Sequence, residues 1–159
     1  YLKGTLYVPS IPIETSILEQ VEDRIRSTVR ALKSIKQSYS SLVTIGSASS
    51  SGLNSESVDY LFLDPPFGAN INYSELNSIW EYWLKVETDN EKEAIENKSQ
   101  NKTLADYRDL MTDCFNEAYR VLKPGRWMTV EFSNTKSAVW NSIQTALIEA
   151  GFIVANVAA

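Results

Sequence analysis

The chain has 159 residues, of which 43% are hydrophobic, and a formal net charge of −5. This length suits one domain with a core of ordinary size, and the mixed charges leave no basic stripe that would bind a nucleic-acid backbone unaided. The single cysteine, Cys114, excludes an internal disulfide, and the absence of histidine excludes Ser-His-Asp catalysis and histidine-based zinc sites.

The composition also bears on where the protein works. No apolar run approaches the roughly 20 residues that cross a bilayer, and no leader pattern opens the chain. Together with the single cysteine, which favours a reducing compartment, this predicts a cytoplasmic protein. The sequence suggests no metal site.

Residues 1–40 are expected to form a lead-in and one helix. Residues 1–10 alternate weakly up to Pro9, which favours a short extended segment. Ser16 and Glu19 fit a capping box, and apolar residues then recur at helical spacing to about residue 36. The charged residues between them are typical of a solvated helix face.

Residues 41–159 are expected to form an α/β core. Apolar runs bounded by Gly, Pro or Ser predict strands at residues 42–45, 58–63, 127–132 and 152–157. Helical spacing predicts three helices: from Ser74 to Leu84, from Thr103 with Asp106 to residues 123–125, and from Lys136 to Ala150 with Gly151 as its stop. Because strands alternate with helices, the sheet should be mainly parallel, with helices flanking it in a single domain over residues 1–159.

Polar stretches and tryptophans complete this description. Residues 47–57 are a serine-rich loop, and residues 87–102 are expected to be a surface excursion. Glu131 and Asn134 follow a strand end, where contact with a cofactor or base is one interpretation, and the favoured interpretation is that they are solvated loop residues. The four tryptophans lie on apolar stripes and are expected in the core: Trp80, Trp83, Trp127 and Trp140.

The run Asp64-Pro65-Pro66-Phe67-Gly68 directly follows the predicted strand 58–63. Two prolines forbid both a helix and central ladder pairing, so the strand must end there. In open α/β sheets, ligands bind beyond the carboxyl ends of the strands. Asp64 therefore stands where chemistry is expected.

These residue types suit the activation of an aromatic amine. The lone pair of a base amine is delocalised into the ring, and acceptors placed against its N–H bonds favour a tetrahedral, reactive nitrogen. The Asp64 carboxylate and the Pro65 carbonyl can supply two acceptors. Phe67 offers a face on which an extruded base can stack, and Gly68 lets the backbone pass close by.

Three strings in the chain resemble the amino-methylating DNA methyltransferases, particularly the adenine-specific ones. They are Asp64 to Gly68 continuing into Asn70-Ile71-Asn72-Tyr73-Ser74-Glu75-Leu76-Asn77, the pair Trp80-Glu81 with Trp83-Leu84, and Val121-Leu122-Lys123-Pro124-Gly125-Arg126-Trp127. The similarity covers roughly residues 41–157. It implies a partial Rossmann-like, class I fold and S-adenosylmethionine as the methyl donor.

The resemblance also implies roles for individual residues. The catalytic positions are Asp64, Pro65, Pro66 and Phe67. The cofactor-binding positions are Gly46, Ser47, Ala48 and Asp64. The base pocket would be lined by Phe67, Asn70, Asn72 and Tyr73, although an asparagine-rich loop is equally typical of turn chemistry.

The chain departs from the family pattern in two ways. The family often has an acid at the position of Ser47, and the glycine-rich Phe-x-Gly-x-Gly loop that holds the methionine part of the cofactor is not in this sequence. The chain is therefore expected to be a fragment of a larger methyltransferase. The rest of that parent chain would supply the missing loop and hold the DNA.

Other functions remain open from the sequence alone. The same motif occurs in methylases that modify a guanine amine in ribosomal RNA, and cytosine is a further possible target. A methylase-like piece without its cofactor loop is alternatively a non-catalytic structural or interaction module.

Overall fold

The computed structural model describes residues 16–34 and 40–157. The chain divides into two compact units, Tyr1–Ile45 and Gly46–Ala159, and each is described by itself. The expected extended segment at residues 1–10 lies outside the described residues. The single domain expected from the sequence stays a prediction.

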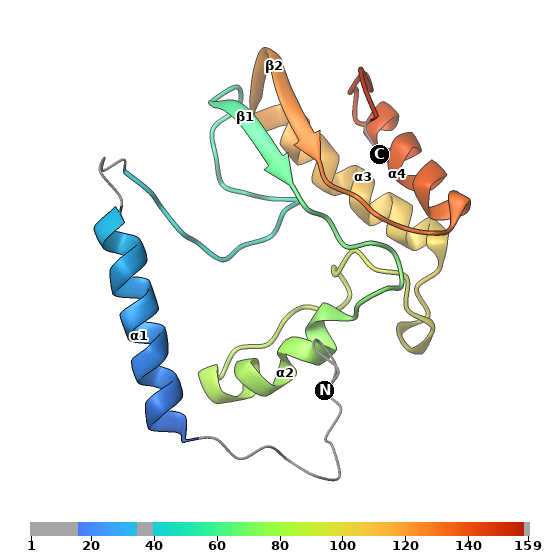
Figure 1. Cartoon of the computed structure of the whole chain (residues 1–159). Coiled ribbons are helices and arrows are strands. Elements are labelled where there is room, and N and C mark those ends of the chain that lie inside the picture. Colours follow the sequence, from blue (N-terminus) through green and yellow to red (C-terminus); the bar gives the residue numbers. More distant parts are fainter. Residues whose placement is uncertain (1–15, 35–39, 158–159) are drawn as a thin grey trace. The chain divides into compact units, whose positions relative to one another are not determined.

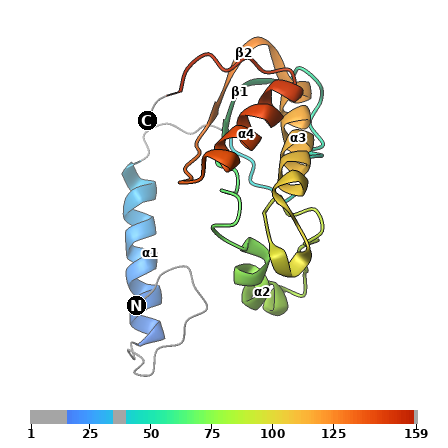
Figure 2. The same cartoon turned by 90° about the vertical axis from the view of Figure 1, so that its right-hand side faces the viewer.

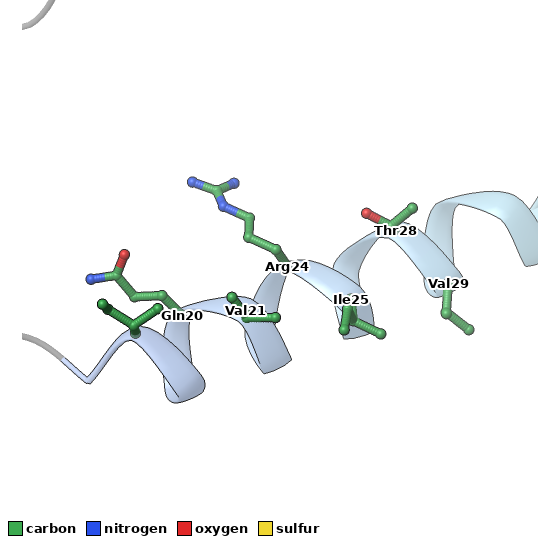
Figure 3. A pocket seen from close by; sticks show the side chains of 7 residues that line it. Gln20, Val21, Arg24, Ile25, Thr28 and Val29 are labelled. Atoms are coloured by element: carbon green, nitrogen blue, oxygen red, sulfur yellow. The ribbon is translucent and has the colours of Figure 1, made fainter. Parts of the chain in front are cut away.

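The described part of the first unit contains the helix α1, Ile17–Ser34, as the apolar spacing predicts. Its first turn is capped by Ser16, whose Oγ accepts a hydrogen bond from the Glu19 N–H at 3.4 Å. The helix buries none of its residues. Figure 3 shows side chains along a shallow hollow on α1, which contains none of the predicted site residues.

The described part of the second unit has mixed α/β structure (Figure 1). Its two strands, β1 (Val58–Leu63) and β2 (Leu122–Val130), form a parallel pair. The helical segments are α2 (Tyr73–Leu84), the 3-10 turn η1 (Lys98–Gln100), α3 (Leu104–Val121) and α4 (Ser137–Glu149). The α/β class and the parallel pairing are therefore confirmed.

The core lies between one face of the sheet and the helices α3 and α4, which Figures 1 and 2 show side by side. Leu63, Met128 and Val130 pack against this core from the strands. Its buried residues are Ala94, Tyr107, Met111, Phe115, Val139, Ile143, Ala146 and Ala150. The other face of the sheet is exposed, because side chains alternate between faces along a strand; it carries Tyr60, Phe62 and Trp127.

Two predicted helix ends are confirmed. At the start of α3, Thr103 and Asp106 form the reciprocal capping box. After α4, Gly151 has φ +98°, the Gly151 N–H donates to the Ile148 carbonyl and the Phe152 N–H donates to the Leu147 carbonyl, both at 3.0 Å. This pair of bonds is a Schellman motif, which needs a residue with positive φ at the position of Gly151.

Two predicted strands are wrong. Residues 42–45 and 152–157 have no regular strand structure in the described chain. Val43 and Ile45 are almost fully exposed, and so is Ile153. A β-branched run becomes a strand only where a neighbouring strand bonds its backbone, and these two runs have no such neighbour in the described residues.

The passage from α3 to β2 is shorter than expected. The helix ends at Val121 and the strand begins at Leu122, five residues before Trp127. Val58 pairs with Leu122, and Tyr60 pairs with Trp127. The predicted breaker at residues 123–125 is thus a bulge inside β2, and regular pairing starts at Trp127, where the strand was expected to begin.

The core assignment of the tryptophans is wrong for three of the four. Trp80, Trp83 and Trp127 are 66–80% exposed. Trp140 alone is half-buried. Apolar spacing shows which residues share a face, but not whether another element covers that face.

Candidate active site

Asp64 lies at the carboxyl end of β1, as the sequence predicts. The parallel pairing continues past Leu63, whose carbonyl accepts a hydrogen bond from the Glu131 N–H at 2.8 Å. Beyond that bond the segments that follow β1 and β2 leave the sheet. Asp64 is exposed, and among the described residues no donor or cation bonds its carboxylate.

The loop after Asp64 is fixed by hydrogen bonds to three successive carbonyls. The Tyr107 hydroxyl donates to the Pro66 carbonyl at 2.6 Å, and Asn134 Nδ2 donates to the Phe67 carbonyl at 2.9 Å. The Glu96 N–H donates to the Gly68 carbonyl at 3.2 Å.

The Pro65 carbonyl differs from these three. Pro65 is buried, yet no donor from the described residues bonds its carbonyl. The loop therefore holds an acceptor that a bound N–H group would satisfy, directly after an exposed carboxylate.

The aromatic ring of Phe67 is packed on one side against another aromatic ring, that of Phe132. It is half-buried and meets Phe132 edge to face, with ring centroids 5.2 Å apart. Phe132 meets Trp140 in the same way at 5.0 Å, and Trp140 Nε1 donates to the Asn134 carbonyl at 2.8 Å. The rings and Asn134 thus tie the loop to the segment between β2 and α4.

Position 68 requires glycine because of its backbone torsion and because a neighbouring side chain lies close. Its φ is +70°, a region that residues with a Cβ rarely adopt. A Cβ at this position would lie 3.1 Å from Val139 Cγ1. The backbone at Gly68 therefore approaches α4 closely, while its expected close approach to a bound base stays a prediction.

Tyr73, the first residue of α2, lies near Asp64. Burial raises the pKa of the Tyr73 hydroxyl, and the negative charges of Asp64 and Glu93 raise it further. The hydroxyl therefore stays protonated at neutral pH. Asn70 is exposed, and Asn72 is a half-buried N-cap of α2 whose side chain makes no capping bond.

The expected surface excursion at residues 87–102 is wrong for residues 93–97, which pack against the loop and the core, whereas residues 87–92 are exposed as expected. Ile95 is fully buried. Glu93 accepts hydrogen bonds from the Ser74 N–H at 2.9 Å and from the Ser74 hydroxyl at 2.5 Å, and Lys102 Nζ donates to the Glu93 carbonyl at 2.6 Å. The segment thus fixes the start of α2, which carries Tyr73.

The predicted cofactor positions Gly46, Ser47 and Ala48 are exposed. Open space surrounds Gly46, where an added Cβ would meet no atom within 4 Å. The Ser47 carbonyl accepts a hydrogen bond from the Ser50 N–H at 3.2 Å. No contact in the described chain joins these three residues to Asp64.

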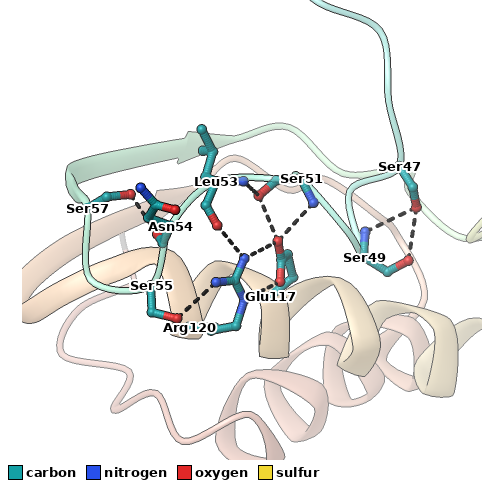
Figure 4. A network of polar contacts seen from close by, with 9 residues as sticks. All are labelled: Ser47, Ser49, Ser51, Leu53, Asn54, Ser55, Ser57, Glu117 and Arg120. Atoms are coloured by element: carbon teal, nitrogen blue, oxygen red, sulfur yellow. Dashed lines mark hydrogen bonds and ion pairs between the residues drawn. The ribbon is translucent and has the colours of Figure 1, made fainter.

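The serine-rich loop that follows is held by α3 (Figure 4). Glu117 Oε1 accepts from the Ser51 N–H at 2.8 Å and from the Ser51 hydroxyl at 2.7 Å. Arg120 donates to the Leu53 carbonyl at 2.7 Å and to the Ser55 hydroxyl at 3.0 Å, and it pairs with Glu117 at 2.7 Å. These charged residues fix the approach to β1.

Sequence reasoning missed two residues of the site. Asn134 was interpreted as a solvated loop residue, which is wrong, because it is half-buried and bonds Phe67. Its position after β2, the neighbour of β1, is the same signal that identified Asp64. Tyr107 lies on the apolar stripe of α3, and nothing in its spacing indicates a partner for its hydroxyl. Glu131 is exposed, as expected.

Comparison with protein families, with curated proteins and with solved structures finds no match to the chain. Within residues 16–34 and 40–157, no group of acids and cysteine is arranged to hold a metal ion. The same residues include no helix whose length and apolar character would let it span a membrane. A proposal for the function therefore depends on the motif and its geometry.

Proposed function

We propose that the chain methylates an exocyclic amine of a nucleic-acid base, with adenine in DNA as the target and S-adenosylmethionine as the methyl donor. One observation carries the proposal. The unpaired Asp64 carboxylate is followed by the unbonded Pro65 carbonyl, in a loop whose next three carbonyls are all bonded. An exocyclic amine has two N–H donors, which matches two free acceptors.

The chemistry required of these residues is alignment and charge stabilisation. S-adenosylmethionine, when bound, would supply a methyl group activated as a sulfonium and leave as the neutral thioether S-adenosylhomocysteine, while the methylated amine would release one N–H proton. The Asp64 carboxylate and the Pro65 carbonyl would accept the two N–H bonds, orient the nitrogen lone pair and stabilise the positive charge that develops on the nitrogen. No histidine is needed for this step.

The base would lie against Phe67 and Tyr73. The half-buried Phe67 ring is fixed by Phe132, so its accessible part is a rigid surface. Tyr73 keeps its proton and is near Asp64, which suits a neutral hydrogen-bonding group at the rim of a base pocket. Stacking of one base on an aromatic ring is worth about 1–3 kcal/mol.

Binding of the cofactor and of the DNA would need protein segments in addition to this chain. The open space around Gly46 suits the close approach of a flat adenine ring, with Ser47 and Ala48 beside it. The sequence contains no glycine-rich loop for the methionine part, and a net charge of −5 does not attract a phosphate backbone. We propose that other segments of a larger methyltransferase supply both functions.

We also propose that β1 and β2 belong to a Rossmann-like sheet. Sheets of this kind carry helices on both faces. Here α3 and α4 cover one face, and the other face exposes Tyr60, Phe62 and Trp127 by more than half of their surfaces. Large aromatic side chains of this kind are expected beneath a second helical layer.

Transfer of labelled methyl groups from S-adenosylmethionine tests the proposal. The full-length protein is incubated with DNA or with RNA, beside the variants Asp64→Ala and Asp59→Ala. Asp59 is a matched control, because it is an exposed acid of β1 that pairs with Lys123. We expect label in DNA from the wild type and from Asp59→Ala, and at least about 100-fold slower labelling by Asp64→Ala. Label in RNA alone would favour the guanine-amine alternative, and label in neither would overturn the proposal.

A further inference from the structure

We propose that Tyr107 and Asn134 are positioning residues that orient the Pro65 carbonyl toward the substrate amine. This inference rests on the proposed function. The two side chains come from different elements, α3 and the segment after β2, and they bond two consecutive carbonyls, those of Pro66 and Phe67.

The backbone torsions explain how these bonds act on Pro65. Peptide units are planar, so only the φ and ψ of Pro66 separate the Pro65 carbonyl from the Pro66 carbonyl. The proline ring fixes φ. The hydrogen bond from the buried Tyr107 hydroxyl fixes the direction of the Pro66 carbonyl and hence restrains ψ. The Pro65 carbonyl is then left with one direction.

Asn134 holds the next carbonyl, and is itself held. Its Oδ1 accepts from the Lys136 N–H at 2.8 Å, and its own carbonyl accepts from Trp140 Nε1 at 2.8 Å. The amide group therefore cannot rotate away from Phe67 without breaking the bond to Lys136. The carbonyls of Pro66 and Phe67 are thus oriented by side chains from other elements.

Both donors are neutral, and this matters beside Asp64. A lysine or arginine bonding the same carbonyls would bring a positive charge close to the Asp64 carboxylate and compete with the substrate amine for it. Burial raises the pKa of the Tyr107 hydroxyl, so it remains a neutral donor. The loop is therefore oriented while Asp64 stays available.

The test compares two conservative variants with a matched control in the full-length protein. Tyr107→Phe removes one hydroxyl and keeps the buried ring. Asn134→Asp keeps the acceptor for Lys136 and places an oxygen against the Phe67 carbonyl. Tyr119→Phe is the control, because it makes the same change on the same helix at a tyrosine that is 54% exposed.

The measurements are kcat, the KM for S-adenosylmethionine and the carbonyl ¹³C shift of Pro66. Selective labelling of proline carbonyls and phenylalanine nitrogens restricts the signals to Pro-Phe pairs, of which Pro66-Phe67 is the only one within these 159 residues, and loss of the signal in Phe67→Leu assigns it. We expect kcat to fall about 10- to 100-fold in both site variants, as for lost alignment, with KM for the cofactor unchanged. We expect the Pro66 shift to move in Tyr107→Phe but not in Tyr119→Phe.

The outcomes separate this inference from the proposed function. If the wild type labels nucleic acid and both site variants keep its kcat, the positioning roles are wrong and the proposed function stands. The same holds if Tyr119→Phe loses as much activity, or if the variants change KM for the cofactor and not kcat. A wild type that labels neither DNA nor RNA overturns both.

Discussion

The two ends of β1 are held by different kinds of contact. Before the strand, the serine-rich loop is bonded by the charged pair Glu117 and Arg120. After it, the loop that begins at Asp64 is bonded by the neutral donors of Tyr107 and Asn134. Charged contacts near solvent are weakened by salt and by pH, whereas buried neutral bonds are not. The proposed function accounts for this difference, because only Asp64 at the second end would have to stay unpaired.

The largest effect is expected from Asp64→Ala. Removing a group that stabilises developing charge typically lowers kcat about 100- to 1,000-fold. An exposed acid without a partner contributes little to the core, so the free energy of unfolding should stay within about 0.5 kcal/mol of the wild type. Steady-state kinetics and urea unfolding measure the two quantities. If the variant keeps its turnover, the unpaired acid after β1 has no catalytic role, and the difference between the two ends of β1 has no functional meaning.

The next largest effect is expected from Gly68→Ala. The positive φ costs about 1–2 kcal/mol with a Cβ, and the contact with Val139 adds about 1–3 kcal/mol. Gly52→Ala is the matched control, because Gly52 has φ +72° and open space around it. We expect urea unfolding to show a loss of stability in both variants, and a larger loss in Gly68→Ala. Equal losses would mean that the loop is not packed against α4 as described.

The loop after Asp64 was predictable from the sequence, but of the two side chains that hydrogen-bond it only Asn134 could have been found. Asp64 and Gly68 were identified because a strand end and two prolines are local signals. Asn134 could have been found from its place after a neighbouring strand. The hydroxyl bond of Tyr107 could not, because it joins residues 41 positions apart and depends on the packing of α3.

The elements of the fold show the same division. Helices with caps, such as α3 and α4, were located closely, because the signals for their ends lie within a few residues. The strands expected at 42–45 and 152–157 failed, because a strand requires a bonded neighbour that no local pattern specifies. The burial of Ala94, Ile95 and Asn97 was missed because it depends on packing against elements distant in the sequence.

A moderate effect is expected from Thr103→Ala, which removes the cap of α3. Loss of an N-cap side chain costs about 0.5–2 kcal/mol. Thr103→Ser keeps the hydroxyl that accepts from Asp106 and should retain most of the stability. Thermal unfolding measures both. Methyl transfer at temperatures well below the midpoint should be unchanged, because the loop bonds are made one turn further along the helix.

The smallest effect is expected from Glu117→Gln, at the charged end of β1. Hydrogen bonds from Arg120 and Ser51 lower the pKa of Glu117 to about 2, below its ordinary value of 4.5. A lowered pKa stabilises the folded state above the ordinary value, and this contribution is lost as the pH falls toward about 2. The stability difference between wild type and variant should therefore shrink between pH 4.5 and 2, and also at high salt. A difference that is constant with pH would show that the charge of Glu117 is not what holds the serine-rich loop.

The most direct test of the central claim is the chemical identity of the methylated product. DNA treated with the full-length protein and S-adenosylmethionine is digested to nucleosides and analysed by mass spectrometry, with Asp64→Ala in parallel. We predict N6-methyladenine from the wild type and at least about 100-fold less from the variant in the same time. A methyl group on a base carbon, or N6-methyladenine formed equally by Asp64→Ala, would contradict the claim that Asp64 and the Pro65 carbonyl activate an exocyclic amine.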